Sequence, residues 1–254
     1  YDRVLEVLDG VDVVVHEAAV TSVVRSIEDP ALTTSVNING TLNLLWASVK
    51  RKVRRFVYAS SSSIYGDTPT LPKHEDLKPN PLSPYAVSKL AGEEYCGVFF
   101  KVYGLATVSL RYFNVYGPRQ RYGPYSGVIT IFTNRLLRGE PPLIYGDGEQ
   151  TRDFTYVEDV AEATVKALEA EGVEGEVFNV GAGSPVTINQ LAWSLIKLTG
   201  SPLKPIHVAP RKGDIRHSHA DTRKVEEFLK WRAKTQLNEG LTKTLAWFKE
   251  RLQA

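Results

Sequence analysis

A tyrosine and a lysine one helical turn apart, preceded by a run of serines, are the residues of this chain best suited to chemistry. Tyr85 and Lys89 are four positions apart in Tyr85-Ala-Val-Ser-Lys89, and Tyr85 follows Ser61 by 24 residues. On a helix, positions i and i+4 share one face, so the phenol and the ammonium can point into one pocket. With a serine hydroxyl, these groups make a proton-transfer site. The alternative is an ordinary surface pair of Tyr85 and Lys89.

Tyr85 needs a neighbouring positive charge to act as a base. A free tyrosine has a pKa of about 10, so its phenol stays protonated at neutral pH unless a cation stabilises the phenolate. Lowering that pKa to about 7 requires about 4 kcal/mol, which a lysine and a cationic cofactor ring can supply in a dry cleft. We therefore expect Lys89 to lower the pKa of Tyr85.

The serine run Ser60-Ser61-Ser62-Ser63 follows the short apolar stretch Arg55-Phe-Val-Tyr-Ala59. An apolar stretch bounded by charge and by turn residues predicts a buried strand that ends in hydroxyls. Catalytic groups of open α/β sheets gather at the carboxyl ends of strands. The alternative is a serine-rich loop, and the downstream tyrosine favours the strand.

Apolar runs and helical patterns alternate along the chain. We expect strands near 11–16, 55–60, 106–111 and 176–180 and helices near 30–50, 84–103, 157–170 and 188–199, with a further helix over residues 1–10. This alternation predicts an α/β fold with a parallel sheet. The proline-rich segment 69–84 predicts a loop that brings the serine strand to the tyrosine helix, and the glycine-rich segment 117–127 predicts the crossing into a second lobe.

Six motifs, in this order, resemble the extended short-chain dehydrogenase/reductase family, specifically its NAD-dependent nucleotide-sugar epimerases. The motifs are Val11-Asp-Val-Val-Val-His-Glu-Ala-Ala19, Val36-Asn-Ile-Asn39-Gly40-Thr41, the Ser61/Tyr85/Lys89 set, Arg111-Tyr-Phe-Asn114-Val-Tyr-Gly-Pro-Arg119-Gln120, Gly146-Asp-Gly148-Glu-Gln-Thr-Arg152-Asp153-Phe154 and Arg211-Lys-Gly-Asp214-Ile-Arg-His-Ser218. The resemblance covers essentially the whole chain. It implies a Rossmann-type doubly wound parallel sheet with a smaller C-terminal domain that binds a UDP-sugar.

The resemblance also implies the role of each site residue. It assigns catalysis to Ser61, Tyr85 and Lys89, and NAD binding to Ala18, Ala19, Asn39, Ser60, Tyr85, Lys89 and Tyr112. It assigns the UDP-sugar to Ser62, Ser63, Asn114, Tyr145, Arg152, Arg211, Asp214 and Ser218. The NAD-binding domain would comprise residues 1–117 with 154–180 returning to it, and the sugar-nucleotide domain 118–254. A homodimer would form through the helices near 30–50 and 84–103.

One family element, a Gly-rich turn between a strand and a helix that holds the NAD pyrophosphate, is not seen near the start of the sequence. We expect an N-terminal part of roughly 60 residues to be missing, since it would contain two overlapping βαβ units. Gly181-Ala-Gly183 lacks the third glycine of this fingerprint, because Val186 stands in its place. We interpret it as an ordinary turn from a strand to a helix.

Composition indicates a globular domain of an intracellular protein. The chain has 254 residues, 43% hydrophobic and 24% charged, with a net charge of only +2. This near-neutral balance argues against nucleic-acid or membrane binding, and the basic cluster Lys50–Arg55 is expected at a solvated helix end. The single Cys96 allows no internal disulfide and fits the reducing cytoplasm. No apolar run approaches the length of a membrane span, and no histidine spacing indicates a metal site.

The residues beside Ser61 favour one reaction of the family. Family dehydratases carry an acidic pair directly after the catalytic hydroxyl, whereas this chain has Ser62 and Ser63. The resemblance therefore implies 4-epimerisation through a 4-keto intermediate. At Ser218, a small residue leaves room for an N-acetyl group, which favours UDP-GlcNAc/UDP-GalNAc and also admits UDP-glucose/UDP-galactose. Thr130 departs from the family pattern, which often has proline there.

Two alternatives stay open. The chain could be another nucleotide-sugar enzyme of the same fold, a uronate epimerase or a decarboxylase, which would differ in the charge of its sugar pocket. It could also be an inactive fragment that binds a sugar nucleotide, in which case it would bind UDP without turnover.

Overall fold

The computed structural model describes residues 1–123, 126–210 and 215–253. The strands are β1 (Val13–His16), β2 (Arg55–Ser61), β3 (Ala106–Tyr112), β4 (Asn114–Tyr116), β5 (Leu143–Tyr145), β6 (Thr151–Tyr156), β7 (Val177–Val180), β8 (Pro185–Thr187) and β9 (Ile206–Val208). The helices are α1 (Asp2–Val7), α2 (Val23–Glu28), α3 (Pro30–Thr34), α4 (Gly40–Lys50), α5 (Pro84–Tyr103), α6 (Val128–Leu137), α7 (Val157–Glu169), α8 (Ile188–Thr199), α9 (Arg223–Leu229) and α10 (Leu237–Gln253), with a π-helical turn η1 (Ser35–Asn39) and a 3-10 turn η2 (Ser62–Tyr65).

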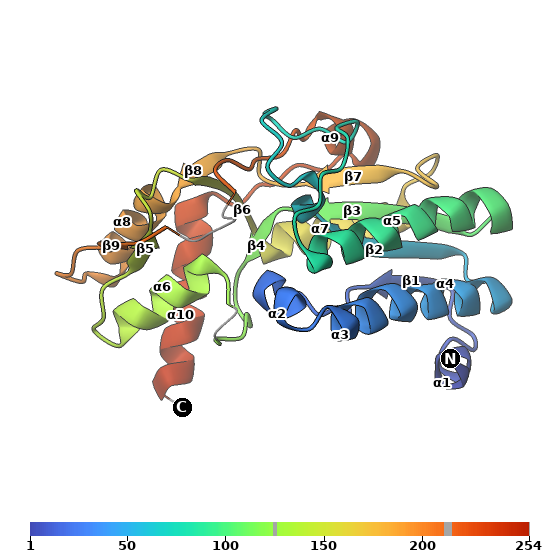
Figure 1. The fold of residues 1–254 in the computed structure, drawn as a ribbon, viewed down its shortest axis with the longest axis horizontal. Coiled ribbons are helices and arrows are strands. Elements are labelled where there is room, and N and C mark those ends of the chain that lie inside the picture. Colours follow the sequence, from blue (N-terminus) through green and yellow to red (C-terminus); the bar gives the residue numbers. More distant parts are fainter. Residues whose placement is uncertain (124–125, 211–214, 254) are drawn as a thin grey trace.

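Four parallel strands form the main sheet, in the order β1-β2-β3-β7 (Figure 1). Strand β2 is buried along nearly its whole length, as expected for a parallel strand covered on both faces. The four expected strands are all present, and the Rossmann-type doubly wound fold is confirmed.

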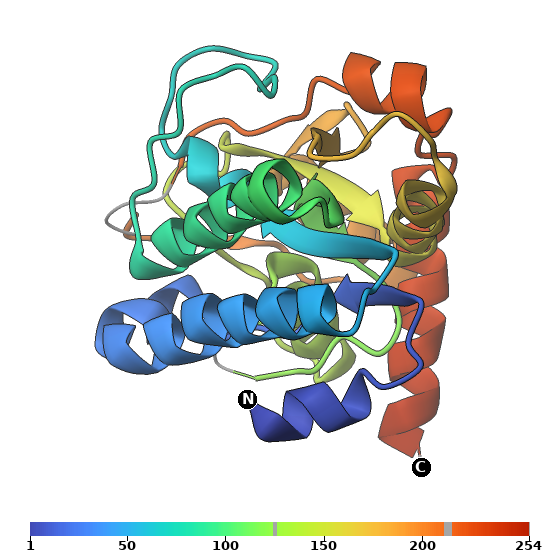
Figure 2. The same cartoon turned by 90° about the vertical axis from the view of Figure 1, so that its right-hand side faces the viewer.

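Side chains alternate between the two faces along each strand, so both faces of this sheet carry apolar residues to bury, and helices cover both. On one face, Phe56 and Tyr58 pack with Cys96 and Phe99 of α5. On the other face, Val57 packs with Val160, and contacts of α7 with β2 and β3 close that side (Figure 2).

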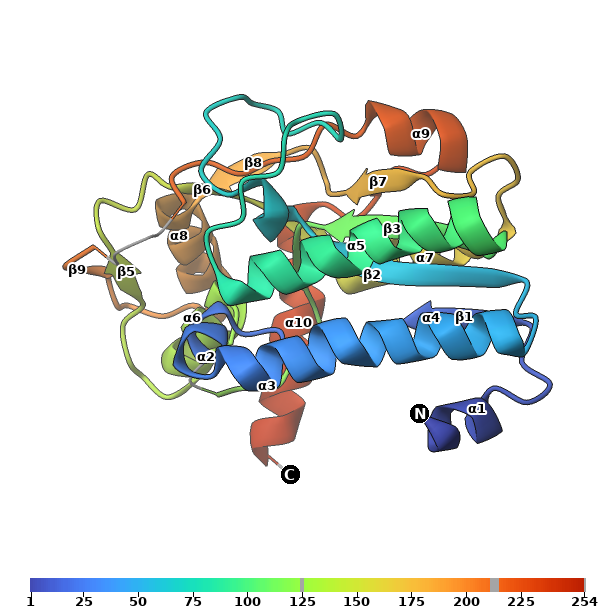
Figure 3. The same cartoon turned by 45° about the vertical axis from the view of Figure 1, so that its right-hand side comes forward.

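The two long helices predicted from the sequence lie side by side on one face (Figure 3). Helix α5 begins after Ser83, whose hydroxyl accepts a hydrogen bond from the Ala86 amide, and ends at Gly104, whose φ of 69° suits glycine. The run over residues 30–50 is helical throughout, but its middle is the π-helical turn η1. Periodicity does not predict such a turn, because it inserts one residue into an otherwise regular pattern.

The second lobe is built from short strands and three longer helices, on the left of Figure 1. Strands β4, β6 and β8 form one small sheet, and β5 pairs with β9. Its core joins α6, α8 and α10 through Phe132, Leu195 and Leu241. Since β4 precedes the crossing segment, β6 pairs with β4 in the small sheet and β7 returns to the main sheet, the chain passes between the two lobes more than once. The domain boundaries given above stay a prediction.

The turn Gly181-Ala-Gly183 binds an internal carboxylate. The amides of Ala182 and Gly183 donate to Asp153 at 2.8 and 3.0 Å, and the Ala220 amide donates to the same side chain. Strand β8 follows this turn before α8 begins, so the turn does not lead directly into a helix as predicted. Because Asp153 takes these donors, the turn does not offer them to a cofactor phosphate.

Within the described ranges, the structure contains no helix that is both long and apolar enough to cross a membrane. In the same residues, no group of three or more His, Cys, Asp or Glu side chains is arranged to hold a metal ion.

Candidate active site

The serine run lies at the carboxyl end of β2, as predicted. Ser61 ends the strand, and its hydroxyl accepts a hydrogen bond from the Ser63 amide at 3.2 Å, which caps η2. Ser62 and Ser63 begin this turn, and the Ser63 Oγ is buried without a hydrogen-bond partner among the described residues. A buried hydroxyl without a partner is costly, so this atom is suited to a bound ligand.

Helix α5 places Tyr85 and Lys89 against that strand end. Tyr85 is half-buried, and its phenol lies close enough to the Ser61 side chain for that hydroxyl to favour the phenolate. The Lys89 ammonium is buried and donates to the Ala59 carbonyl at 2.7 Å, and it lies 5.1 Å from the centre of the Tyr58 ring. The structure therefore brings the three predicted catalytic residues to one strand end.

Burial dominates the electrostatics of this site. It raises the pKa of Tyr85, and the Ser61 hydroxyl opposes the rise. It lowers the pKa of Lys89 to about 8, and the charge of Glu17 opposes the fall. The protein groups thus keep Tyr85 protonated at neutral pH, and the expected lowering of its pKa by Lys89 is not resolved in this arrangement.

The predicted NAD-binding residues lie mainly along the carboxyl edge of the main sheet. Ala18 and Ala19 follow β1, and Tyr112 ends β3, where it is directly paired with the predicted catalytic residue Ser61 at the end of β2. The Tyr112 hydroxyl contacts Glu17 at 2.9 Å. Open α/β sheets bind their ligands at this edge, where the carboxyl ends of β1, β2 and β3 lie next to one another.

Two further residues predicted to bind NAD are placed differently. Asn39 is exposed on η1, and the Ser60 hydroxyl donates to the Glu93 carboxylate at 2.7 Å inside the protein.

Lys89 fits a ribose well, because its ammonium has three donors and the described residues take one of them, at the Ala59 carbonyl. The residues present therefore fit the nicotinamide-ribose end of the cofactor.

Asn37 is a buried residue of this edge that sequence reasoning missed. Its Oδ1 accepts from the Val20 amide at 2.7 Å, and its Nδ2 donates to the Val20 carbonyl and to the Ser88 hydroxyl at 3.0 and 2.9 Å. It therefore ties the segment after β1 to α5. The signal in the sequence is the spacing of Thr33 and Thr41, four positions before and after Asn37, which places three polar residues on one helical face; the structure buries all three.

Three of the predicted substrate-binding residues line one cavity of about 220 Å³. Asn114 comes from β4, Tyr145 from β5 and Arg152 from β6, and the guanidinium of Arg152 donates to the Thr151 carbonyl at 2.8 Å. Ser218 lies beside them, since its amide contacts the same Thr151 carbonyl at 3.3 Å. Arg211 and Asp214 lie outside the described residues.

Gln150 also lines this cavity and was not singled out by the sequence. Its Nε2 donates to the Tyr145 carbonyl at 2.8 Å, while its Oε1 is buried with no partner in the described part of the chain. An acceptor of this kind is suited to an N–H group of a ligand.

The parallel sheet, together with a serine, a tyrosine and a lysine at its carboxyl edge, defines a fold and site of the short-chain dehydrogenase/reductase type. A family profile described as the NAD dependent epimerase/dehydratase family matches residues 1–181. The chain belongs to this family, and NAD is the family's cofactor.

Curated relatives agree with this membership. The chain is 40% identical over 243 residues to a UDP-glucose 4-epimerase of Mycolicibacterium smegmatis, covering 95% of this chain and 77% of the relative. It is 39% identical over 247 residues to a UDP-glucuronate 4-epimerase of Thermodesulfobacterium geofontis, covering 96% of this chain and 74% of the relative.

Solved structures are similar over nearly the whole chain. A UDP-glucose 4-epimerase of Thermotoga maritima with UDP-glucose superposes with a TM-score of 0.95 at 42% identity, covering 99% of this chain and 82% of the other. A UDP-N-acetylglucosamine 4-epimerase of Methanobrevibacter ruminantium in complex with UDP-N-acetylmuramic acid gives 0.94 at 37% identity, covering 98% of this chain and 80% of the other.

Proposed function

We propose that this chain catalyses the reversible 4-epimerisation of a UDP-hexose. The observation that carries the proposal is the meeting of Tyr85 with Ser61 at the end of β2, with the buried Lys89 ammonium one helical turn further along α5. The placement of this set at the carboxyl edge of a parallel sheet is what an NAD-dependent reaction at a sugar carbinol requires.

In this mechanism Tyr85 is the general base and then the general acid. Its phenolate takes the proton of the sugar 4-hydroxyl, and Ser61 hydrogen-bonds the same oxygen. Lys89 stabilises the phenolate, which burial alone disfavours. Bound NAD supplies the acceptor, and afterwards the donor, of the hydride on carbon 4. When the 4-keto sugar has turned over, so that carbon 4 presents its other face to the hydride, Tyr85 returns the proton to the 4-oxygen.

The cavity lined by Asn114, Tyr145 and Arg152 is the proposed site of the UDP moiety. A guanidinium suits a diphosphate because its planar donors bind two oxygens together. Arg211 and Asp214 are proposed contacts through their motif. Asn114 would hold the phosphate or sugar end while the sugar turns.

We propose UDP-GlcNAc and UDP-GalNAc as preferred substrates, with UDP-glucose and UDP-galactose also accepted. The support is the small side chain of the half-buried Ser218 beside Arg152, together with the similarity to the Methanobrevibacter ruminantium enzyme. The second candidate is a uronate 4-epimerase or decarboxylase, which the relative from Thermodesulfobacterium geofontis favours. A chain that binds UDP without turnover remains the third.

We also propose a homodimer through α3, α4 and α5, in a protein that works in the cytoplasm. Helix α5 exposes apolar side chains, among them Val87 and Val98 with exposed fractions of 48% and 47% and Val102 with 65%. Exposed valines spaced along one long helix are typical of a surface that a partner covers.

The experiment is turnover by the purified chain, with NAD added, of UDP-GlcNAc, UDP-glucose and UDP-glucuronate in parallel, followed by chromatography. We expect UDP-GalNAc from the first sugar nucleotide, and bound NAD by mass spectrometry. Turnover of UDP-glucuronate alone would favour the second candidate. Binding of UDP without any product would favour the third.

A further inference from the structure

Glu93 lies one helical turn beyond Lys89 on the face of α5 that meets the sheet, and it is buried. Its Oε1 accepts from Arg111 Nη2 at 2.6 Å, and its Oε2 accepts from Arg111 Nε at 3.1 Å and from the Ser60 hydroxyl at 2.7 Å. The carboxylate therefore connects α5 with two neighbouring strands.

These contacts involve the residue pair directly before Ser61 in the β2–β3 register. Ser60 and Arg111 are paired in the β2–β3 register, and the next pair is Ser61 with Tyr112. The helix is also tightly packed at this point, because a Cβ added to Gly92 would lie 2.3 Å from the Tyr58 hydroxyl oxygen. These contacts therefore fix the position of α5 relative to β2 and β3, close to Ser61.

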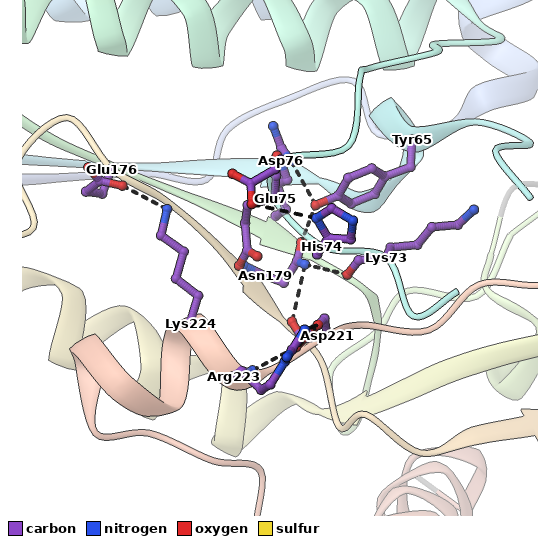
Figure 4. Close-up of polar contacts among 11 residues, drawn as sticks. Tyr65, Lys73, His74, Glu75, Asp76, Glu176, Asn179, Asp221, Arg223 and Lys224 are labelled. Carbon is purple, nitrogen blue, oxygen red and sulfur yellow. Dashed lines mark hydrogen bonds and ion pairs between the residues drawn. The ribbon is translucent and has the colours of Figure 1, made fainter. Parts of the chain in front are cut away.

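Arg111 also holds the far end of the serine segment. Its Nη1 donates to the Tyr65 hydroxyl at 2.8 Å, and Tyr65 ends η2. The Tyr65 hydroxyl donates in turn to Asn179 Oδ1 at 2.7 Å, and both side chains meet beside the Lys73–Asp76 segment in Figure 4. Residues 60–65 are therefore fixed at both ends by one ion pair.

A buried ion pair of this kind adds little net free energy of folding. Both side chains are buried, and the loss of solvation offsets much of the attraction between buried charges. Burial disfavours the charged Arg111, but the hydrogen bonds and charge of Glu93 outweigh it and raise the pKa of Arg111. The guanidinium and carboxylate thus keep one defined geometry.

We propose that Glu93 is a positioning residue, which through Arg111 and Ser60 holds the Ser61 hydroxyl in register with the Tyr85 phenol. This inference rests on the proposed function, in which Ser61 and Tyr85 share one substrate oxygen. A displacement of about 1 Å between such groups can cost about 100-fold in rate, so a clamp at this point acts on the chemical step.

The test compares Glu93→Gln with Glu174→Gln. Glu174 pairs with Arg55, which begins the same strand β2, at the same 2.6 Å distance, so the control removes a matched ion pair from the other end of β2. We expect Glu93→Gln to lower kcat about 10- to 100-fold with KM changed less than about threefold. Glu174→Gln should leave kcat within about twofold of wild type.

A rescue variant separates positioning from simple stability. Glu93→Asp keeps the charge but is one methylene shorter, so it should recover the melting temperature while kcat stays low. Recovery of kcat in step with the melting temperature would overturn the inference. If Glu93→Gln does not fold, Tyr65→Phe leaves the ion pair intact and should still lower kcat, since it releases the far end of the segment.

Hydrogen exchange gives a readout that does not depend on turnover. Glu93→Gln should speed amide exchange in residues 60–66, whereas Glu174→Gln should not. If the wild type turns over no UDP-sugar, the proposed function fails and the exchange data decide about Glu93. Unchanged exchange in Glu93→Gln, or faster exchange with normal kcat in an active enzyme, would refute the positioning role.

Discussion

The Lys89 ammonium donates a hydrogen bond to the Ala59 carbonyl, 2.7 Å away, at the end of β2. This contact orients a buried cation between the strand and the Tyr85 helix. Its burial lowers the pKa of Lys89 to about 8 from an ordinary 10.5, so keeping the charge costs folding free energy.

Lys89→Met is therefore expected to stabilise the protein while it abolishes turnover. The removed burial cost exceeds the lost hydrogen bond, so the expected net gain at pH 7 is about 1–2 kcal/mol. Between pH 8 and 10.5 the unfolded state binds more protons at Lys89 than the folded state, so the stability of the wild type rises with pH and the advantage of the variant shrinks. Urea unfolding of both proteins at pH 7 and pH 10 measures this, and an advantage that grows with pH would contradict it.

Tyr85→Phe should remove turnover and leave UDP binding intact. The phenol is the proposed proton carrier, and it takes no part in the cavity lined by Arg152. We expect kcat to fall by at least about 1,000-fold, in the range found for loss of a general base. Isothermal titration with UDP should give the wild-type affinity. Intact epimerisation by this variant would refute the mechanism.

Arg152→Gln should weaken UDP binding. Loss of a charge-assisted contact to the diphosphate is expected to cost about 1.5–3 kcal/mol, or about 10- to 150-fold in Kd. Arg232→Gln, which changes an exposed arginine outside the cavity, is the matched control and should bind like wild type. Equal affinities of the two variants would show that the diphosphate lies elsewhere.

His16 should make the protein sensitive to acid. Burial, with the charge of Lys89, lowers its pKa to about 4 from 6.5, so between these values the unfolded state binds more protons and stability falls as pH falls. From pH 7 to pH 5 this single group should remove about 2 kcal/mol. His16→Gln should lose less over that interval, and the exposed His207→Gln should behave like wild type. Parallel losses in all three proteins would contradict this prediction.

Charges on the outer side of α5 should dissociate the proposed dimer. Val98→Glu/Val102→Glu places two carboxylates on that face, whereas Val165→Glu places one on α7 at a similarly exposed valine, 50% accessible. Light scattering should give a monomer for the first variant and a dimer for the second. A dimer in both cases would place the interface elsewhere.

The sequence was sufficient for the elements whose patterns are long. Strands β2 and β3 are seven residues each, and α5 is twenty residues between a serine cap and a glycine, so periodicity and end signals agree. Strands β4 and β5 have three residues each, too few for any alternation to be recognised. Their pairing depends on contacts made across the second lobe.

The candidate site also has features that the sequence predicted and features that it did not. The spacing of Tyr85 and Lys89 predicted a shared helical face, and the structure has it. The partner of Lys89 could not be predicted, because a backbone carbonyl such as that of Ala59 has no signature in a sequence. The Glu93–Arg111 pair was missed because charged residues on helices and strands are more often solvated than buried.

The cavity proposed to bind UDP takes its walls from distant parts of the chain, with Asn114 on β4 and Ile188 at the start of α8, and the Ser218 amide donates to the Thr151 carbonyl beside it. A ribosome releases the chain from its N-terminus, and nearby segments pair first. Ser61, Tyr85 and Lys89 can thus meet when α5 and β3 have emerged, before the walls of the cavity proposed to bind UDP are all present. The order of synthesis therefore places assembly of the proposed UDP site after the meeting of the proposed proton-transfer residues.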